Sequence, residues 1–214
     1  MNIVDLTHLI RPDMPVYPGT EGPKLAPANT VERDGFCETL LTMYSHTGTH
    51  MDAPAHLFMD RPTLDAFPAS AFCGTALTID CSKLAGGARI TMDRIRPRLA
   101  EAEKADFLIF FTGWSRHWGR DAYFDGFPVM AREVAEFLIQ TKKKGVGLDA
   151  ISVDAVGDAA LPIHKLLLKN ADVVIVENLT NLEQTLGAPF TFFSLPLKYA
   201  NADGAPARAI ALLA

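Results

Sequence analysis

Three of the six histidines of this chain fall within eleven consecutive residues. The segment reads His-Thr-Gly-Thr-His-Met-Asp-Ala-Pro-Ala-His and contains His46, His50, Asp52 and His56. Imidazole nitrogens and carboxylate oxygens are the ligands that a borderline divalent cation prefers. The clustering therefore predicts a metal site. The alternative is a polar turn whose histidines make ordinary hydrogen bonds.

The residues between the histidines indicate the conformation of the segment. A helix would place His46 and His50 on one face, but Gly48, two threonines and a proline all disfavour a helix. We therefore predict a loop or extended turn, in which Gly48 lets the backbone fold tightly so that imidazoles and a carboxylate converge. A strand over residues 39–44 is expected to lead into it.

Two residues of the C-terminal half have side chains that suit the same chemistry. Glu177 directly follows the apolar run 173–176, so its carboxylate should lie at the edge of the hydrophobic interior, where an unpaired charge is costly. Taken alone, Glu177 could instead cap the next turn or pair with an arginine. His164 is followed by three leucines and, taken alone, is more typical of a core histidine. Together with the first cluster, both become candidate metal ligands.

The elements that position these residues alternate between strands and helices. The irregular loop 11–27, with five prolines, is expected to line or cover a site through Met14, Val16 and Tyr17. The order of elements predicts an α/β domain over residues 1–214 with a mixed sheet. Strands are predicted at residues 2–6, 39–44, 75–79, 107–111, 171–176, 190–199 and 207–213, with a short one ending at 149, and helices at 92–104, 129–141 and 161–170.

An aromatic segment follows the predicted strand 107–111. Trp114, Trp118 and Tyr123, together with Phe58, could form a wall for a flat aromatic substrate. The alternative is ordinary packing in the core or in a dimer interface.

The composition argues against several classes of partner. With 20 basic and 25 acidic residues the formal net charge is −5, so neither nucleic acid nor an anionic membrane is an expected partner. No apolar run approaches the roughly 20 residues of a transmembrane helix, and we see no signal peptide. Cys37, Cys73 and Cys81 have no pairing pattern, which predicts buried thiols in a reducing compartment and a cytoplasmic protein. The chain also lacks a serine-hydrolase elbow and a glycine-rich nucleotide loop.

The pattern His-x-Gly-Thr-His-x-Asp-x-Pro-x-His at residues 46–56 resembles the signature of the cyclase-like metal-dependent hydrolases, the family that contains bacterial kynurenine formamidase and isatin hydrolase. The resemblance implies a swivelling β/β/α fold, in which a mixed central sheet is flanked by helices, and a homodimer or higher homo-oligomer. Weaker matches along nearly the whole chain are Pro18-Gly19, Thr112-Gly113-Trp114, Gly147-Leu148-Asp149, Ser152-Val153-Asp154, His164 with Leu167-Leu168, and Glu177-Asn178-Leu179.

The resemblance also implies roles for the candidate residues. One or two divalent ions are expected, Zn²⁺ in preference to Mn²⁺, with Asp52 and Glu177 as candidate bridges between two ions. His56 matches the position that acts in proton transfer. The implied metal ligands are His46, His50 and Asp52 for a first ion, with His164 and Glu177 completing the site.

The expected function is that of a metal-dependent amidohydrolase. Metal-activated water would cleave a C–N amide bond in a small molecule, and the first expectation is an aryl formamide such as N-formylkynurenine. One alternative is the opening of a cyclic amide such as isatin. Another is a catalytically inactive metal-binding module.

Overall fold

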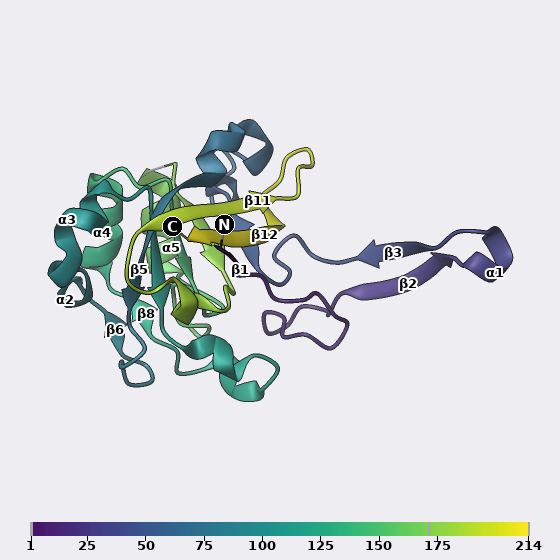
Figure 1. The fold of residues 1–214 in the computed structure, drawn as a ribbon, viewed down its shortest axis with the longest axis horizontal. Helices are drawn as coiled ribbons and strands as arrows, with labels where there is room; N and C mark the ends of the chain where they lie inside the picture. Colours follow the sequence, from purple (N-terminus) through teal and green to yellow (C-terminus); the bar gives the residue numbers. More distant parts are fainter. Residues whose placement is uncertain (1, 171, 214) are drawn as a thin grey trace.

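The computed structural model describes residues 2–170 and 172–213 and is built around one mixed sheet (Figure 1). Eight strands lie in the order β1-β12-β11-β5-β7-β9-β10-β4, and β12 also pairs with β4, so the sheet closes on itself. The neighbours β5, β7, β9 and β10 run parallel, and the other pairs are antiparallel. The strands are β1 (Asn2–Asp5), β4 (His50–Asp52), β5 (Cys73–Asp80), β7 (Phe107–Phe111), β9 (Gly145–Leu148), β10 (Val174–Glu177), β11 (Phe190–Pro196) and β12 (Gly204–Leu213).

Short helices cover part of this sheet. Figure 1 shows α2, α3 and α4 gathered on the side of the molecule opposite a long projecting hairpin. No helix among the described residues combines the length and the hydrophobicity needed to cross a lipid bilayer. The remaining α-helices and strands are α2 (Met92–Ile95), α3 (Leu99–Lys104), α4 (Arg132–Gln140), α5 (Pro162–Asn170), the strand pair β6 (Arg89–Ile90) and β8 (Val129–Met130), and the hairpin elements β2 (Lys24–Asn29), α1 (Val31–Asp34) and β3 (Glu38–Thr42).

The central strand β7 shows how the sheet divides the core. Leu108 and Phe110 pack in the hydrophobic cluster that includes α4 and α5, whereas Phe107 and Ile109 pack in a second cluster with β4, β11 and β12. Successive side chains of a strand point to opposite faces, so β7 is buried on both sides. The predicted strand 107–111 is confirmed, together with its burial on both faces.

Several predicted boundaries are wrong because pairing or proline chemistry overrides local patterns. The predicted helix 92–104 is broken into α2, a 3-10 turn at Arg96–Arg98 and α3, with Pro97 inside the turn because proline lacks the N–H that a continuous helix needs. The predicted helix 129–141 begins only at Arg132, because Val129 and Met130 pair with β6. The predicted strands 2–6, 75–79, 190–199 and 207–213 are present with shifted ends.

Two further predictions are corrected near the histidine segment. The loop 11–27 ends before Lys24, where β2 begins. The predicted loop at residues 46–56 contains strand β4, because His50–Asp52 pair with both β10 and β12. Ala171, the first residue of the predicted strand 171–176, lies outside the described residues, and β10 starts at Val174.

The three cysteines are unpaired, as predicted, but differ in burial. Cys81 is buried and Cys73 is half-buried. Cys37 is exposed on the projecting hairpin, so the prediction of buried thiols is wrong for this residue.

The hairpin formed by β2, α1 and β3 extends away from the sheet (Figure 1). Within the described part of the chain, β2 and β3 pair only with each other. Large apolar side chains are nevertheless exposed along it: Leu25, Val31, Phe36, Leu40, Leu41 and Tyr44. An isolated two-stranded hairpin with exposed apolar side chains is only marginally stable in water.

His8 provides a pH-sensitive contact at the start of the chain. Its ring stacks on Trp118 with a centroid distance of 3.9 Å and an interplanar angle of 4°. Its Nε2 is buried and accepts or donates no hydrogen bond with the described residues. Burial lowers the pKa of His8 from 6.5 to about 4, because the protonated ring loses water without gaining a partner.

We therefore expect acidification to destabilise the fold through His8. The unfolded state binds a proton near pH 6.5 and the folded state only near pH 4, so this contribution is complete above pH 6.5 and is lost progressively as the pH falls toward 4. Relative to a His8→Phe variant, the wild type should lose about 1 to 2 kcal/mol of unfolding free energy between pH 7 and pH 5 in urea titrations. An equal pH dependence in both proteins would contradict this account.

Candidate metal centre

Two neighbouring strands bring metal-binding side chains to one face of the sheet. β4 and β10 run antiparallel, with His50 opposite Glu177 and Asp52 opposite Ile175. Because side chains alternate along a strand, His50 and Asp52 point to the same face, and Glu177 lies beside His50. Met51, between the two ligand candidates, is fully buried in the core below.

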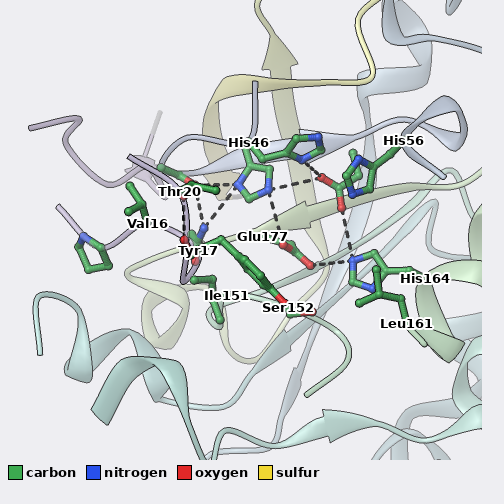
Figure 2. Close-up of a pocket in the computed structure, with 15 residues that line it drawn as sticks. Val16, Tyr17, Thr20, His46, His56, Ile151, Ser152, Leu161, His164 and Glu177 are labelled. Atoms are coloured by element: carbon green, nitrogen blue, oxygen red, sulfur yellow. Dashed lines mark hydrogen bonds and ion pairs between the residues drawn. The ribbon is translucent and has the colours of Figure 1, made fainter. Parts of the chain in front are cut away.

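His164 reaches the same point from the first turn of α5. The Asp154 carboxylate accepts hydrogen bonds from the backbone N–H groups of Ile163 and His164, both at 3.0 Å, and so caps the helix. The same carboxylate lies 2.8 Å from His164 Nδ1. A carboxylate on one ring nitrogen fixes the orientation of a metal-binding histidine, and here it leaves Nε2 directed toward Glu177 (Figure 2).

The inner group consists of His50, Asp52, His164 and Glu177, each no more than 5% exposed. His50 Nε2 lies 3.4 Å from Asp52 Oδ1 and 3.5 Å from Glu177 Oε2. His164 Nε2 lies 3.5 Å from Asp52 Oδ2 and 3.2 Å from Glu177 Oε1. Ligands around a tetrahedral Zn²⁺, with bonds of about 2.0–2.1 Å, are separated by about 3.3–3.4 Å. The donor spacing of His50, Asp52 and Glu177 therefore fits one divalent cation, and His164 lies beside the other oxygens of the two carboxylates.

Glu177 supplies the strongest independent sign that a cation fits here. Its Oε1 is buried and accepts no well-formed hydrogen bond from any described residue, although His164 Nε2 is near. Burial, reinforced by the neighbouring charge of Asp52, raises the pKa of Glu177. Burial also opposes ionisation of Asp52, but His46 and the hydrogen bonds from the surrounding histidines hold its pKa well below the usual value. A cation bound beside two adjacent buried carboxylates of this kind would stabilise their ionised forms.

His46 and His56 form an outer group with Asp52. His46 Nδ1 lies 2.7 Å from Asp52 Oδ1, the oxygen that His50 also approaches. The His46 and His56 rings lie 4.1 Å apart. One ligand atom from each of His46, Asp52 and His56 lies within 4.8 Å of the others, and the same holds for His50, Asp52 and Glu177. Asp52 thus belongs to two overlapping groups, an arrangement that could hold one cation or two.

Asp203 is a residue that the sequence analysis missed. Its Oδ2 lies 3.3 Å from His46 Nε2 and 4.0 Å from His56 Nδ1. The hydrogen bond with His46 is the main reason that the pKa of Asp203 is depressed. Burial opposes protonation of His46, but Asp52 and Asp203 outweigh it and raise the pKa of His46 to about 10. Asp203 directly precedes Gly204 in what reads as an ordinary turn, and nothing in its spacing links it to residues 46–56.

A cavity of about 280 Å³ opens onto both groups. Its apolar wall includes Val16 and Tyr17 from the N-terminal loop, and Figure 2 shows them across the cavity from His164. The Tyr17 hydroxyl donates a hydrogen bond to the Val156 carbonyl at 3.1 Å. The full lining is Pro15, Val16, Tyr17, Thr20, His46, Gly48, His50, Asp52, His56, Ile151, Ser152, Leu161, His164, Glu177 and Asn178.

The structure thus brings together all six residues predicted as metal ligands or as the proton-transfer group, and it places Tyr17 in the cavity wall. The aromatic residues predicted as a substrate wall lie elsewhere. Phe58, Trp114 and Trp118 are partly buried against the core cluster around α4 and α5, and Trp118 also stacks on His8. They do not line the cavity because the core and the N-terminal segment already occupy their faces.

The chain is similar in sequence to a known protein family and to curated proteins. A family model described as "Putative cyclase" matches residues 4–155. An uncharacterized protein of Methanocaldococcus jannaschii is 32% identical, with both chains covered completely. A kynurenine formamidase of Bacillus mycoides is 28% identical over 97% of this chain and 95% of the relative.

The fold is also similar to those of solved structures. Isatin hydrolase A from Labrenzia aggregata has a TM-score of 0.87 and 30% identity, covering 98% of this chain and 93% of that one. A structure described as a potential metal-dependent hydrolase with cyclase activity has a TM-score of 0.80 and 29% identity, covering 98% and 96%. These likenesses confirm the predicted α/β fold with its mixed sheet.

Gly204 allows His46 to lie against β12, and its substitution should disturb the outer group. A Cβ at this position would clash with His46 Cε1, so in Gly204→Ala the ring must shift from its position beside Asp52. We expect the affinity for Zn²⁺, measured by competition with a chelating dye, to fall about tenfold or more.

Gly157→Ala is the matched control, since no described atom lies within 4 Å of its added Cβ and the residue is exposed. If folded Gly204→Ala binds Zn²⁺ as tightly as Gly157→Ala, the orientation of His46 is not important for the site.

Proposed function

The chain belongs to the Cyclase family and is a metal-dependent hydrolase, and from this premise we propose that it cleaves the C–N bond of a small amide. The observation that carries the proposal is the buried inner group, in which two histidines and two carboxylates from β4, β10 and α5 converge and Glu177 Oε1 accepts no hydrogen bond from the described residues. The first candidate substrate is an aryl formamide such as N-formylkynurenine, which a kynurenine formamidase relative supports.

We assign cation binding to His50, Asp52, His164 and Glu177, with His46 as the additional ligand on the outer side. A bound divalent ion supplies water of lowered pKa and polarises a carbonyl oxygen. The mixed nitrogen and oxygen donor set suits Zn²⁺, our first choice, and also Mn²⁺. Asp52 takes part in both groups of potential ligands, so it could hold a second ion as well as the first.

We assign proton transfer to His56. Its side chain is 29% exposed, so it can exchange protons with solvent while also lining the cavity. Burial is the main reason that the pKa of His56 is lowered, which favours a neutral ring able to accept a proton. A departing amine must gain a proton when the amide bond breaks, and His56 is placed to deliver it. Tyr17 is the proposed substrate contact on the opposite wall.

The charge of the cavity wall supports a second candidate substrate. Among the described residues that line the cavity there is no lysine or arginine. The α-carboxylate of an amino acid such as N-formylkynurenine would therefore meet neither a lysine nor an arginine there. An uncharged ring amide such as isatin needs none, and isatin hydrolases share the fold. The apolar side chains Val16, Ile151 and Leu161 suit a flat ring in either case.

We expect the purified chain to contain a divalent metal and to hydrolyse N-formylkynurenine or isatin in a spectrophotometric assay. Removal of the metal should abolish turnover, and Zn²⁺ or Mn²⁺ should restore it. In the metal-loaded protein, His56→Ala should lower kcat by about 10²- to 10⁴-fold while the cation of the inner group is retained, because His56 is the proton-transfer group and is not among the inner ligands.

The outcomes separate the hypotheses. Turnover of isatin alone would favour the ring amide. Metal binding without turnover of either compound or of a wider set of amides and lactones would favour an inactive metal-binding module. A chain that takes up no divalent cation would overturn the proposal, and wild-type turnover in His56→Ala would remove His56 from the mechanism.

We further propose that the chain forms a homodimer in the cytoplasm. The exposed apolar arm supports a dimer, since packing on a second copy would bury the side chains that the arm leaves in water. Three unpaired cysteines support a reducing compartment.

The arm offers a direct test of the dimer. Light scattering after size-exclusion chromatography should show a dimer for the wild type and a shift toward monomer for Leu40→Glu, because the charge would be buried without a partner. Met59→Glu is the control, since Met59 is fully exposed on the body of the molecule. A monomeric wild type, or an unaffected Leu40→Glu dimer, would exclude this role of the arm.

A further inference from the structure

We propose that Tyr123 and Asn178 form a positioning pair that orients His50 for the cation. The aromatic segment 114–124, which does not line the cavity, would then support the metal centre from behind. This inference rests on the proposed function, because it concerns the same site. Neither Tyr123 nor Asn178 has a role in the proposed hydrolysis itself.

Asn178 is placed by the backbone turn that ends β10. It directly follows Glu177 and has a φ of 57°, the left-handed region that asparagine tolerates better than most residues. Its N–H donates to the Ala150 carbonyl at 3.0 Å, and its carbonyl accepts from the Thr49 hydroxyl. The turn interrupts the alternation of the strand, so Glu177 and Asn178 both line the cavity, and both are almost fully buried.

The side-chain amide of Asn178 has two partners that define its orientation. Nδ2 donates to the Gly48 carbonyl at 2.9 Å, and Oδ1 accepts from the Tyr123 hydroxyl at 2.6 Å. The reversed orientation would set two acceptor oxygens against each other at Gly48. The Gly48 carbonyl and Tyr123 therefore hold the amide in one orientation.

The Gly48 carbonyl that Asn178 contacts also contacts the ring of His50. It lies 2.9 Å from His50 Nδ1, and because a carbonyl only accepts, Nδ1 carries the proton. His50 Nε2 is then left with its lone pair on the side of Asp52 and Glu177, where a cation would bind. Asn178 holds the carbonyl in place and completes the lining behind the His50 ring, 3.4 Å from Nδ1.

Tyr123 is itself held firmly. It is fully buried, its ring lies edge-on to Trp118 at 5.1 Å, and its carbonyl accepts a hydrogen bond from Trp114 Nε1 at 3.0 Å. Tyr123 and the two tryptophans thus link the Asn178 amide to the core. A hydroxyl on such a rigid support is suited to locating another group.

The test uses Tyr123→Phe, Asn178→Gly and the double variant. Phenylalanine keeps the buried ring, and glycine accepts the positive φ while removing the amide, so both variants should fold. The readout is the Zn²⁺ dissociation constant by dye competition. We expect it to rise about tenfold to a hundredfold in Asn178→Gly and less in Tyr123→Phe. Because Tyr123 acts through Asn178, the double variant should bind as Asn178→Gly does.

Nitrogen NMR of the Zn²⁺-loaded protein reports on the hydrogen bond of His50 directly, and so separates a local effect on this ring from a general loss of stability. The Nδ1–H signal of His50 should be protected from solvent exchange in the wild type and exchange faster in both variants. Thr78→Val is the matched control, since it removes a buried hydroxyl bonded to Thr185 at 2.6 Å, outside the cavity, and should leave Zn²⁺ affinity unchanged.

Effects of the two substitutions that add in the double variant, or affinities no different from Thr78→Val, would overturn the inference. A wild-type chain that binds neither Zn²⁺ nor Mn²⁺ would instead overturn the proposed function, so the two failures are distinguishable.

Discussion

Two carboxylates, Asp52 and Glu177, are buried side by side in the wall of a sheet. Like charges held this close in a poorly hydrated place repel each other strongly, so positive charge beside them or protonation of one carboxylate is needed to stabilise the arrangement. Among the protein's own groups the histidines supply positive charge, since His46, whose pKa is raised to about 10, lies against Asp52. A divalent cation bound at this position would supply the same positive charge to both carboxylates. Asp154, which caps α5, orients His164 toward the two carboxylates. Asp203 lies within hydrogen-bond distance of His46, which in turn contacts Asp52.

Much of this site could be predicted from the spacing of residues. His46, His50, Asp52 and His56 are close in sequence, so any compact conformation of the segment brings them near one another. Glu177 could be placed because an apolar strand followed by a carboxylate indicates a charged group at the edge of a core. The central strands and α5 were also predictable, since their apolar runs are long enough to dominate local preferences.

The parts that could not be predicted depend on pairing between distant segments. Strand β4 is only three residues long, and its extended form comes from β10 and β12 on its two sides rather than from its own sequence. Asp203 and Asn178 acquire their partners only when these strands meet, and each would otherwise read as a polar residue in a turn. Trp114 and Trp118 illustrate the reverse case, because aromatic composition alone does not distinguish a substrate wall from a support behind it.

The ligands and the cavity walls come from different kinds of element, and this division bears on how one fold can serve several substrates. The inner ligands lie on β4, β10 and the first turn of α5, where neighbouring strands and a capped helix hold them in place. The walls include Val16 and Tyr17 from the N-terminal loop and Leu161 from the connection before α5. One hydrogen bond, from Tyr17 to Val156, joins these two loops across the cavity. Changes in loop residues can therefore reshape the substrate wall while the register of β4 and β10 keeps the cation ligands together.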